Sequence, residues 1–472
     1  MTASPMKPVL LLNVVGLSSR QIDESTPNLF ALAKRGASAP MTSILPAVTM
    51  SAQATMLTGK LPTEHGVVGN GWMDPKTQEI AFWKQSNALV DGMKLYEKAR
   101  ALDPKFTCAK LFWWFNMGAA VDWSVTPRPF YAADGRKDFS IYTSPPSYRE
   151  ELEDPLGAFP FFDFWGPRAG LASSRWITDA ALVSMERHKP SLTMVYLPHL
   201  DYDHQRFGPE APQSKRALVE VDGLVGELVS AADKFDAETI VVSEYGIEPV
   251  SRAIHINRCL REAGLLKVRP GPFGEYLDPF ASEAFAVSDH QVAHIYTKSS
   301  ASKQAALEAL QSLSGIDQLL SCDDRASAGL DHANAGDIVA VAEAGAWFTY
   351  YYWQGDAQAP DFAPTVDIHR KPGYDPAELF VDPSIKFPKA RIANRLARKV
   401  IGLRYMMDVI PINAELVRGS HGRLPATPDA GPVFMSSAGF DNCGGAPATG
   451  IVEMTSVADR VLALLLREDP AN

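Results

Sequence analysis

The stretch Pro46–Asp74, PAVTMSAQATMLTGKLPTEHGVVGNGWMD, decides how the rest of the chain can be interpreted. Thr49 follows the apolar run 44–48, which predicts a strand, and opens the helical pattern SAQATMLT, which Gly59 ends. The Thr49 hydroxyl is therefore expected where a strand meets a helix N-terminus. Backbone N–H groups and the helix dipole favour a phosphate or another oxyanion there. An ordinary N-cap threonine would give the same pattern, so both interpretations stay open at this point.

The composition is that of an ordinary globular protein with an acidic balance. The 472 residues include 45 Lys and Arg against 55 Asp and Glu, which gives a net charge of −10, and 46% are apolar. This length allows two or three units, and we expect one large domain that carries an insertion. No Lys/Arg cluster suggests a nucleic-acid or anionic-lipid surface, so we expect neither kind of partner. The oligomeric state is left open.

The N-terminal apolar run and the cysteines predict a cytoplasmic address. Val9–Leu12, followed by Asn13, Val14 and Val15, has the length of a strand and is too short to span a bilayer. It has no basic flank and no small-residue cleavage site, so no signal peptide is expected. The cysteines are scattered without a CxxC pair, which favours reduced thiols: Cys108, Cys259, Cys322 and Cys443.

The order of predicted elements gives an α/β class. Residues 9–15 form a near-continuous apolar run, which is typical of a parallel strand covered on both faces. Residues 27–35 follow Thr26 at an N-cap position and end before Gly36, which predicts a helix. Residues 192–197 and 239–243 are further strands, and each ends in polar residues. Ligands gather at the carboxyl ends of such strands, so those residues should converge near Thr49.

The pattern changes between residues 251 and 365. Strands are predicted at 292–297, 316–320 and 337–342, with a helix at 302–313. We interpret this as a small α+β unit inserted into the main sheet. The predicted domains are therefore a core of residues 1–250 and 366–472 and an inserted cap of residues 251–365.

Three polar clusters follow strands and could carry chemistry. The densest is His199-Leu-Asp201-Tyr-Asp203-His204-Gln205. If the preceding strand continues, His199, Asp201 and Asp203 project to one side, an arrangement that suits Zn²⁺ or Mn²⁺. A polar loop that binds no metal is the equal alternative. The other clusters are Ser243-Glu244-Tyr245-Gly246 and Ser420-His421-Gly422. Weaker single candidates are His255, Asp289, His290, His294, Asp367 and His369.

Together these pieces resemble the alkaline phosphatase superfamily, in its nucleotide pyrophosphatase and type I phosphodiesterase branch, with phosphonoacetate hydrolase as a near relative. The motifs occur in the family's order and span almost the whole chain: TPNLFALAKRG, LPAVTMSAQATMLTGKLPTEHGVVGN, YLPHLDYDHQRFGP, VVSEYGI and GSHG. The resemblance implies a central mixed sheet sandwiched by helices, with the cap at the inserted unit. It also implies a threonine nucleophile, which would be Thr49, and two metal ions, usually zinc.

Several positions depart from the pattern of this family. Val15 stands where the family has its first-strand Asp, with Asn13 as the nearest polar group. Asp201 is retained, but Gln205 replaces a ligand His, with His204 adjacent. The family's SDHG is Ser243-Glu244-Tyr245-Gly246 here.

The resemblance allocates Asp201 and His421 to the first metal, and Thr49 and Glu244 to the second. The losses put a full two-zinc site in doubt and favour a single ion, or a harder one such as Mg²⁺ or Mn²⁺. Weaker ligand candidates are Asn13, His204, Gln205 and Tyr245, and a rebuilt site could also use His199, His290 or His369. Gln53 and Asn70 are weak candidates for substrate contact.

We expect a metal-dependent hydrolase of a phosphate monoester, diester or phosphonate with Thr49 as nucleophile. The rival hypothesis is a binding or scaffold protein that keeps the fold and has lost the chemistry. An isomerase or phosphotransferase of the same superfamily has no specific residue in its favour. The aromatic runs 112–115 and 347–353 could line a pocket, although core packing is expected for most of their members.

Overall fold

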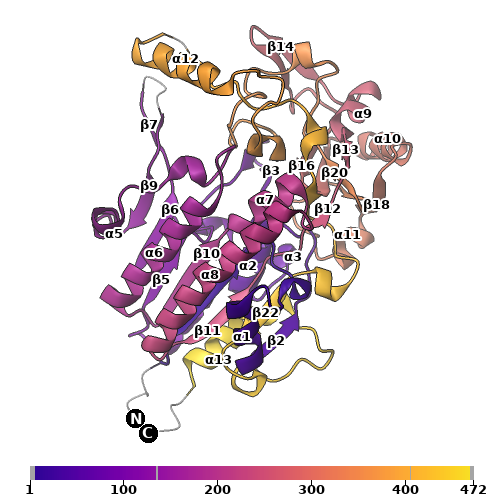
Figure 1. The fold of residues 1–472 in the computed structure, drawn as a ribbon. Helices are drawn as coiled ribbons and strands as arrows, with labels where there is room; N and C mark the ends of the chain where they lie inside the picture. The colour runs from indigo at the N-terminus through magenta and orange to yellow at the C-terminus, as the bar shows by residue number, and fades with distance from the viewer. Residues whose placement is uncertain (1–5, 134–136, 404, 468–472) are drawn as a thin grey trace.

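The computed structural model describes residues 6–133, 137–403 and 405–467, and a central eight-stranded sheet organises them (Figure 1). β1 (Val9–Val14) lies between β10 (Leu192–Leu197) and β11 (Glu238–Val242), parallel to both. The sheet continues in parallel through β5 and β6, and antiparallel strands β9 and β22 follow on its two sides, with β2 beyond β22. Their bounds are Cys108–Leu111 (β5), Trp123–Pro127 (β6), Ile141–Ser144 (β9), Val433–Ser436 (β22) and Ala37–Pro40 (β2).

Helices cover both faces of this sheet. On one face, α8 (Pro212–Lys234) packs against α1 (Pro27–Arg35), α6 (Leu171–His188) and α7 (His199–Phe207) (Figure 1). On the other face, α13 (Val457–Leu465) packs against α2 (Thr49–Thr58) and α4 (Leu95–Leu102). Every residue of β1 and β10 is buried between these layers. The predicted α/β sandwich is confirmed.

A second, four-stranded antiparallel sheet has its own apolar core. Its order is β16-β17-β19-β18, with bounds Ala284–Asp289, Val292–Thr297, Ile338–Ala342 and Ile316–Ser321. Helices α9 (Ile256–Glu262) and α10 (Ser300–Gln311) pack against it. The aromatic run 347–353 is buried in this core, which Phe82 and Val417 also join. The domain boundaries drawn from the sequence stay a prediction.

The strand predicted at 44–48 is absent, and the strand at 192–197 does not continue past Leu197; proline explains both. The run 44–48 is a loop, because β2 ends at Pro40 and Pro46 has no N–H to give to a sheet ladder. Val48 occupies the N-cap position, and Thr49 is the first residue of α2. After β10, Pro198 likewise ends the strand, and the chain continues as α7.

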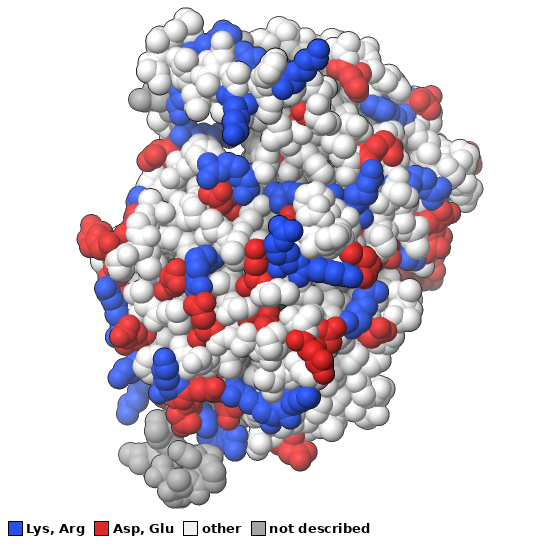
Figure 2. All heavy atoms as spheres, in the orientation of Figure 1, with Lys and Arg blue, Asp and Glu red and all other residues white. Residues whose placement is uncertain are grey.

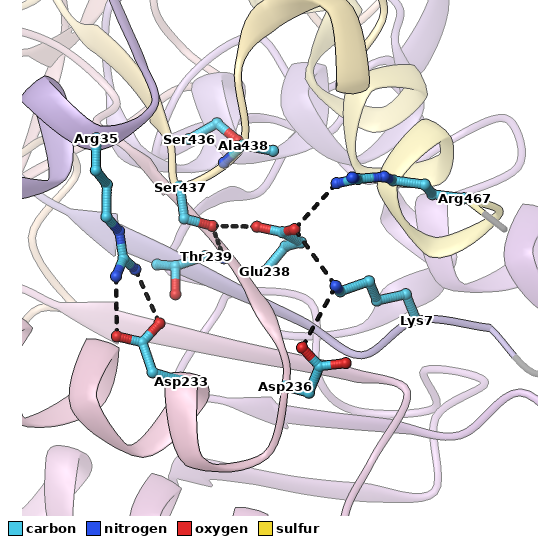
Figure 3. A network of polar contacts seen from close by, with 10 residues as sticks. All are labelled: Lys7, Arg35, Asp233, Asp236, Glu238, Thr239, Ser436, Ser437, Ala438 and Arg467. Atoms are coloured by element: carbon cyan, nitrogen blue, oxygen red, sulfur yellow. Dashed lines mark hydrogen bonds and ion pairs between the residues drawn. The ribbon is translucent and has the colours of Figure 1, made fainter. Parts of the chain in front are cut away.

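A network of charges joins the two chain ends at the opposite edge of the sheet from the strands' carboxyl ends. Figure 3 shows Glu238, at the start of β11, between Lys7 and Arg467, at 3.6 and 3.2 Å. Ser437 Oγ donates to the same carboxylate at 2.5 Å.

No helix in the described ranges is both long and apolar enough to cross a bilayer.

A buried ion triad fixes the segment that returns from the second sheet. Lys371 Nζ lies 2.7 Å from Asp375 Oδ2 and 2.7 Å from Glu378 Oε1, and all three side chains are buried. Glu378 also accepts hydrogen bonds from Trp165 Nε1 at 2.6 Å and Asp367 N at 3.0 Å. The triad therefore ties this segment to the loop before α6.

Replacing Lys371 by Met should destabilise the protein strongly. Two buried carboxylates would lose their common cation, which costs about 3–5 kcal/mol of unfolding free energy. Urea unfolding followed by far-UV circular dichroism measures this. Lys60→Met is the matched control, because Lys60 and Glu64 form an exposed ion pair of little energetic weight. Equal midpoints for the two variants would contradict the assignment.

Candidate active site

A cavity of about 330 Å³ opens at the carboxyl edge of the central sheet. Thr49, Asp201, Tyr245 and His421 line it and come from four distant parts of the chain. β10 leads directly into α7, which carries Asp201, and β11 leads into Tyr245. The strand-end clusters therefore meet beside the first turn of α2.

Thr49, Tyr245 and His421 form a stacked, hydrogen-bonded group. Thr49 Oγ1 lies 3.1 Å from the Tyr245 hydroxyl, and the Tyr245 ring stacks on the His421 ring with centroids 3.5 Å apart and an interplanar angle of 8°. His421 Nδ1 lies 2.7 Å from Ala47 O, and a carbonyl only accepts, so Nδ1 carries the proton. Burial lowers the pKa of His421 to about 3, so this imidazole is neutral.

Glu244 is buried and held by two side-chain amides. Its Oε1 accepts from Asn13 Nδ2 at 2.7 Å and from Gln53 Nε2 at 2.6 Å. Gln53 Oε1 in turn accepts from Trp114 N at 2.8 Å, so both ends of this amide are engaged within the chain. Burial raises the pKa of Glu244 to about 8, although the hydrogen bonds favour its charged form. The carboxyl is therefore mostly protonated at neutral pH.

Asp201 has a similar environment on α7. Its Oδ2 accepts from Gln205 Nε2 at 2.7 Å, a contact that the i, i+4 spacing of the helix permits. Gln205 Oε1 accepts from the Tyr374 hydroxyl at 2.8 Å, and the Tyr374 ring stacks on His290 with centroids 3.7 Å apart. Burial raises the pKa of Asp201 to about 7.

His199, Asp201 and Asp203 do not project to one side, as a continued strand would have required, because residues 199–207 form a helix and a helix turns about 100° per residue. His199 Nε2 lies 2.8 Å from Glu220 on α8, and Asp203 pairs with Arg206 at 3.0 Å. Only Asp201 of the three lines the cavity.

The remaining histidine candidates divide between the cavity and the rest of the protein. His290 and His369 line the cavity. His204 is buried with its Nε2 3.4 Å from Gln21 Nε2, outside the cavity lining. His294 contacts Val68 O at 2.9 Å, so neither of these two reaches the other candidate ligands.

Asn70 positions the start of α2. Its Oδ1 accepts from Met50 N at 3.0 Å, one residue after Thr49. Asp289, at the end of β16, accepts from Asn70 N at 2.7 Å and from Asn70 Nδ2 at 3.1 Å. The second sheet thus holds the helix that presents Thr49, and Asn70 is engaged in that contact.

Aromatic side chains form a large part of the cavity wall, and sequence reasoning missed most of them. Of the two aromatic runs singled out, only Trp114 lines the cavity. The segment 159–165, FPFFDFW, contributes four residues and was readable as a third aromatic run. The ring-bearing members of the lining outside the earlier runs are Trp83, Tyr131, Phe139, Phe161, Phe162, Phe164, Trp165, Tyr196, Tyr202, Tyr245 and Tyr374.

The side chains present do not fit a two-metal centre. Within the described residues there is no group of three or more His, Cys, Asp or Glu side chains that could hold an ion. The amides of Asn13, Gln53 and Gln205 direct N–H donors at the two carboxyl groups, in the role a cation would have. One oxygen of each carboxyl, Asp201 Oδ1 and Glu244 Oε2, has no hydrogen-bond partner in the described chain, so each can carry a proton or meet a ligand.

The contact between Asp289 and Asn70 should make stability depend on pH. Burial raises the pKa of Asp289 to about 7, so its contribution is present below the unfolded value of about 3.8 and is lost as pH rises through 7. The difference in unfolding free energy between wild type and Asp289→Asn should therefore fall between pH 4 and 7.5. The constant cost of the altered hydrogen bond does not affect this slope. Urea midpoints at five pH values measure it, and a flat or rising difference contradicts the shift.

The comparisons with known proteins agree with this architecture. A curated uncharacterized pyrophosphatase/phosphodiesterase of Schizosaccharomyces pombe is 25% identical over 231 residues, 48% of this chain, and the chain spans only 41% of that protein. Phosphonoacetate hydrolase from Sinorhizobium meliloti, solved with phosphonoformate, superposes with a TM-score of 0.61 at 14% identity, covering 98% of this chain and 96% of the other. For human ectonucleotide pyrophosphatase/phosphodiesterase 5 the TM-score is 0.56 at 16% identity, with 99% and 97% covered. The family model described as type I phosphodiesterase / nucleotide pyrophosphatase matches residues 9–375, so this chain belongs to that family, within the alkaline phosphatase superfamily.

Proposed function

We propose that this chain hydrolyses a phosphorus ester of a small molecule with an apolar part, with Thr49 as the nucleophile. One observation carries the proposal: the Thr49 hydroxyl, at the first position of α2, opens into the cavity together with Tyr245 and Asp201. A helix N-terminus favours the charge of a phosphoryl group beside the hydroxyl that attacks it.

The side chains of the site can carry the proton transfers. Thr49 Oγ1 attacks phosphorus, and its proton passes to Glu244 in its carboxylate form, which is the minor form at neutral pH. Glu244 lies close enough to Thr49 for the hydroxyl to lower its pKa. The Tyr245 hydroxyl donates to a phosphoryl oxygen, and protonated Asp201 gives its proton to the leaving oxygen. Water then attacks the phosphothreonine and gives a proton to the Asp201 carboxylate, and protonated Glu244 returns its proton to Thr49 Oγ1 as the P–O bond to threonine breaks. These steps use the residues of the chain alone.

The wall of the cavity supports an apolar or ring-bearing substrate. Aromatic rings surround the reacting groups and bind apolar surface or stack on rings. Two structural neighbours were solved with small phosphorus compounds: phosphonoacetate hydrolase with phosphonoformate, and an inactive Thr-to-Ala variant of murine ectonucleotide pyrophosphatase/phosphodiesterase 5 with AMP. These ligands suggest a substrate of similar size at the phosphorus end.

Thr49→Ala should abolish turnover of an aryl phosphate, phosphodiester or phosphonate ester, and Thr49→Ser should retain part of it. The serine hydroxyl can still attack, whereas alanine cannot. Chromogenic aryl esters measure the rate, and the melting temperature checks folding. Thr58→Ala on the same helix is the control, since the Thr58 hydroxyl donates to Ala54 O within α2 and should leave turnover intact. Unchanged turnover in Thr49→Ala refutes the nucleophile.

The second candidate is ligand binding without turnover. It is favoured by the way the amides of Asn13, Gln53 and Gln205 engage the two carboxyl groups, while the Tyr245 phenol lies against the Thr49 hydroxyl. A protein of this kind would hold the same class of ligand in the aromatic cavity. Saturable binding with no product after long incubation distinguishes it from the hydrolase.

Metal analysis distinguishes two expectations: the geometry of the site predicts no bound metal, whereas the resemblance to the family implies zinc. We expect less than one equivalent of zinc, manganese or magnesium in the native protein, and no shift of melting temperature with EDTA. Restoring the ligands of the family with Val15→Asp, Gln205→His, Glu244→Asp and Tyr245→His should create zinc binding. Stoichiometric metal in the native protein would show that Asp201, His421, Thr49 and Glu244 do hold an ion.

A further inference from the structure

One segment of this acidic chain carries a concentrated positive charge. Between Asp382 and Asp408 there is no acidic residue, and the basic residues there are Lys386, Lys389, Arg391, Arg395, Arg398, Lys399 and Arg404. The segment contains α12 (Pro388–Val400), which lies at one end of the molecule (Figure 1). The overall charge of −10 hides this local excess.

α12 is amphipathic, and most of its apolar face is uncovered. Ile392, Leu396 and Val400 follow each other at a spacing of four and so lie on one face. Ile392 packs beside Val409 on the body of the protein. Leu396 is 46% exposed and Val400 is 85% exposed. The helix is therefore anchored at its first turns and presents the rest of its apolar face to the surroundings.

The residues that flank α12 extend this apolar surface. Phe387 is 76% exposed and Ile401 is 69% exposed, and Leu403 is also exposed. Scattered single apolar residues are normal on a surface, but here five exposed large ones lie within 17 residues of the chain.

The basic residues of the segment are only partly neutralised. Asp408 pairs with Arg391 and Arg395, the latter at 2.8 Å. Within the described ranges, four others form no ion pair: Lys386, Lys389, Arg398 and Lys399. Figure 2 shows Lys and Arg side chains gathered over this end of the molecule, with uncharged atoms between them.

The mouth of the cavity lies beside the same segment. Met407, in the last part of this segment, and Val409, just after it, line the cavity. Tyr131, Phe139 and Phe162 also line it, and all three are exposed. Exposed aromatic rings of this kind are suited to the region between lipid headgroups and acyl chains.

We propose that α12 and its flanks bind the surface of an anionic membrane, with the helix in the plane of the interface and its apolar face inserted. An amphipathic helix with Lys and Arg on one face and Phe and Leu on the other binds lipid in this way. Nucleic acid would leave the apolar face unused, and a second copy of the same face would bring like charges together. The inference departs from the expectation that no membrane partner exists, which was drawn from the net charge and from finding no Lys/Arg cluster; residues 386–404 are such a cluster. It does not depend on the proposed hydrolysis.

Sedimentation with lipid vesicles tests the proposal on the full chain. Vesicles of phosphatidylcholine with 30% phosphatidylglycerol should bind the protein at about 0.1 M salt, and pure phosphatidylcholine should bind it about tenfold or more weakly, because each Lys or Arg near an anionic surface adds roughly fivefold. Lys389→Glu with Arg398→Glu should lower binding by about tenfold or more. Leu396→Ser with Val400→Ser, which leaves the charge unchanged, should also lower it. Hydrogen exchange should slow at residues 388–403 when anionic vesicles are added.

Matched variants on α8 control for charge and apolar area. Lys215→Glu with Arg216→Glu alters the net charge by the same amount as the charge variant of α12, and Val219→Ser removes an exposed apolar residue. Both control variants should bind anionic vesicles as wild type does. Equal binding to neutral and anionic vesicles overturns the proposal. So does wild-type binding by either α12 variant, or protection of residues 388–403 by soluble heparin as strong as that by vesicles.

Discussion

Two buried carboxyl groups at the carboxyl edge of the central sheet constrain the site more than any other feature. Within the described residues, Asp201 and Glu244 have no ion pair with Lys or Arg, and an isolated charge is very costly to bury. Such a group must be protonated, hydrogen-bonded or matched by a cation. Here the amides of Asn13, Gln53 and Gln205 supply N–H donors, and the pKa of both carboxyls is raised by burial.

The departures from the family pattern share one cause, which is that the buried carboxyl groups are matched by hydrogen-bond donors of the chain in place of a cation. Val15 cannot bind a cation, and its neighbour Asn13 donates to Glu244 instead. Tyr245 stands in place of a smaller imidazole, and its hydroxyl reaches Thr49 at 3.1 Å while its ring stacks on His421. Each change replaces a bond to a metal by a contact within the chain. The presentation of Thr49 survives because it depends on α2 and Asn70, and these contacts do not involve the altered positions.

Continuous apolar runs made much of the fold predictable. β1, β10 and β17 lie where the sequence placed them, because a strand buried on both faces must be largely apolar. The errors arose where a proline interrupts a run of apolar or alternating residues that would otherwise form a strand. Pro46 and Pro198 both end strand pairing in this way.

The site was only partly predictable, for a different reason. Thr49, Asp201, Tyr245 and His421 follow strands or open helices, so topology brings them to one edge of the sheet. The partners of these residues depend on long-range packing. Nothing local in the sequence links Gln53 to Glu244, 191 residues apart, or Asn70 to Asp289, 219 residues apart.

Charge is distributed unevenly over the molecule, which the net charge alone does not show. The carboxyl-rich site is close to neutral, because burial raises the pKa values of Asp201 and Glu244 to about 7 and 8. The surface beside the cavity is basic, and Lys389, Arg398 and Lys399 form no ion pair with any residue that the structure describes. An anionic ligand approaching from that side would meet attraction at the surface and little repulsion inside, so the path into the cavity is favourable although the protein as a whole is negative.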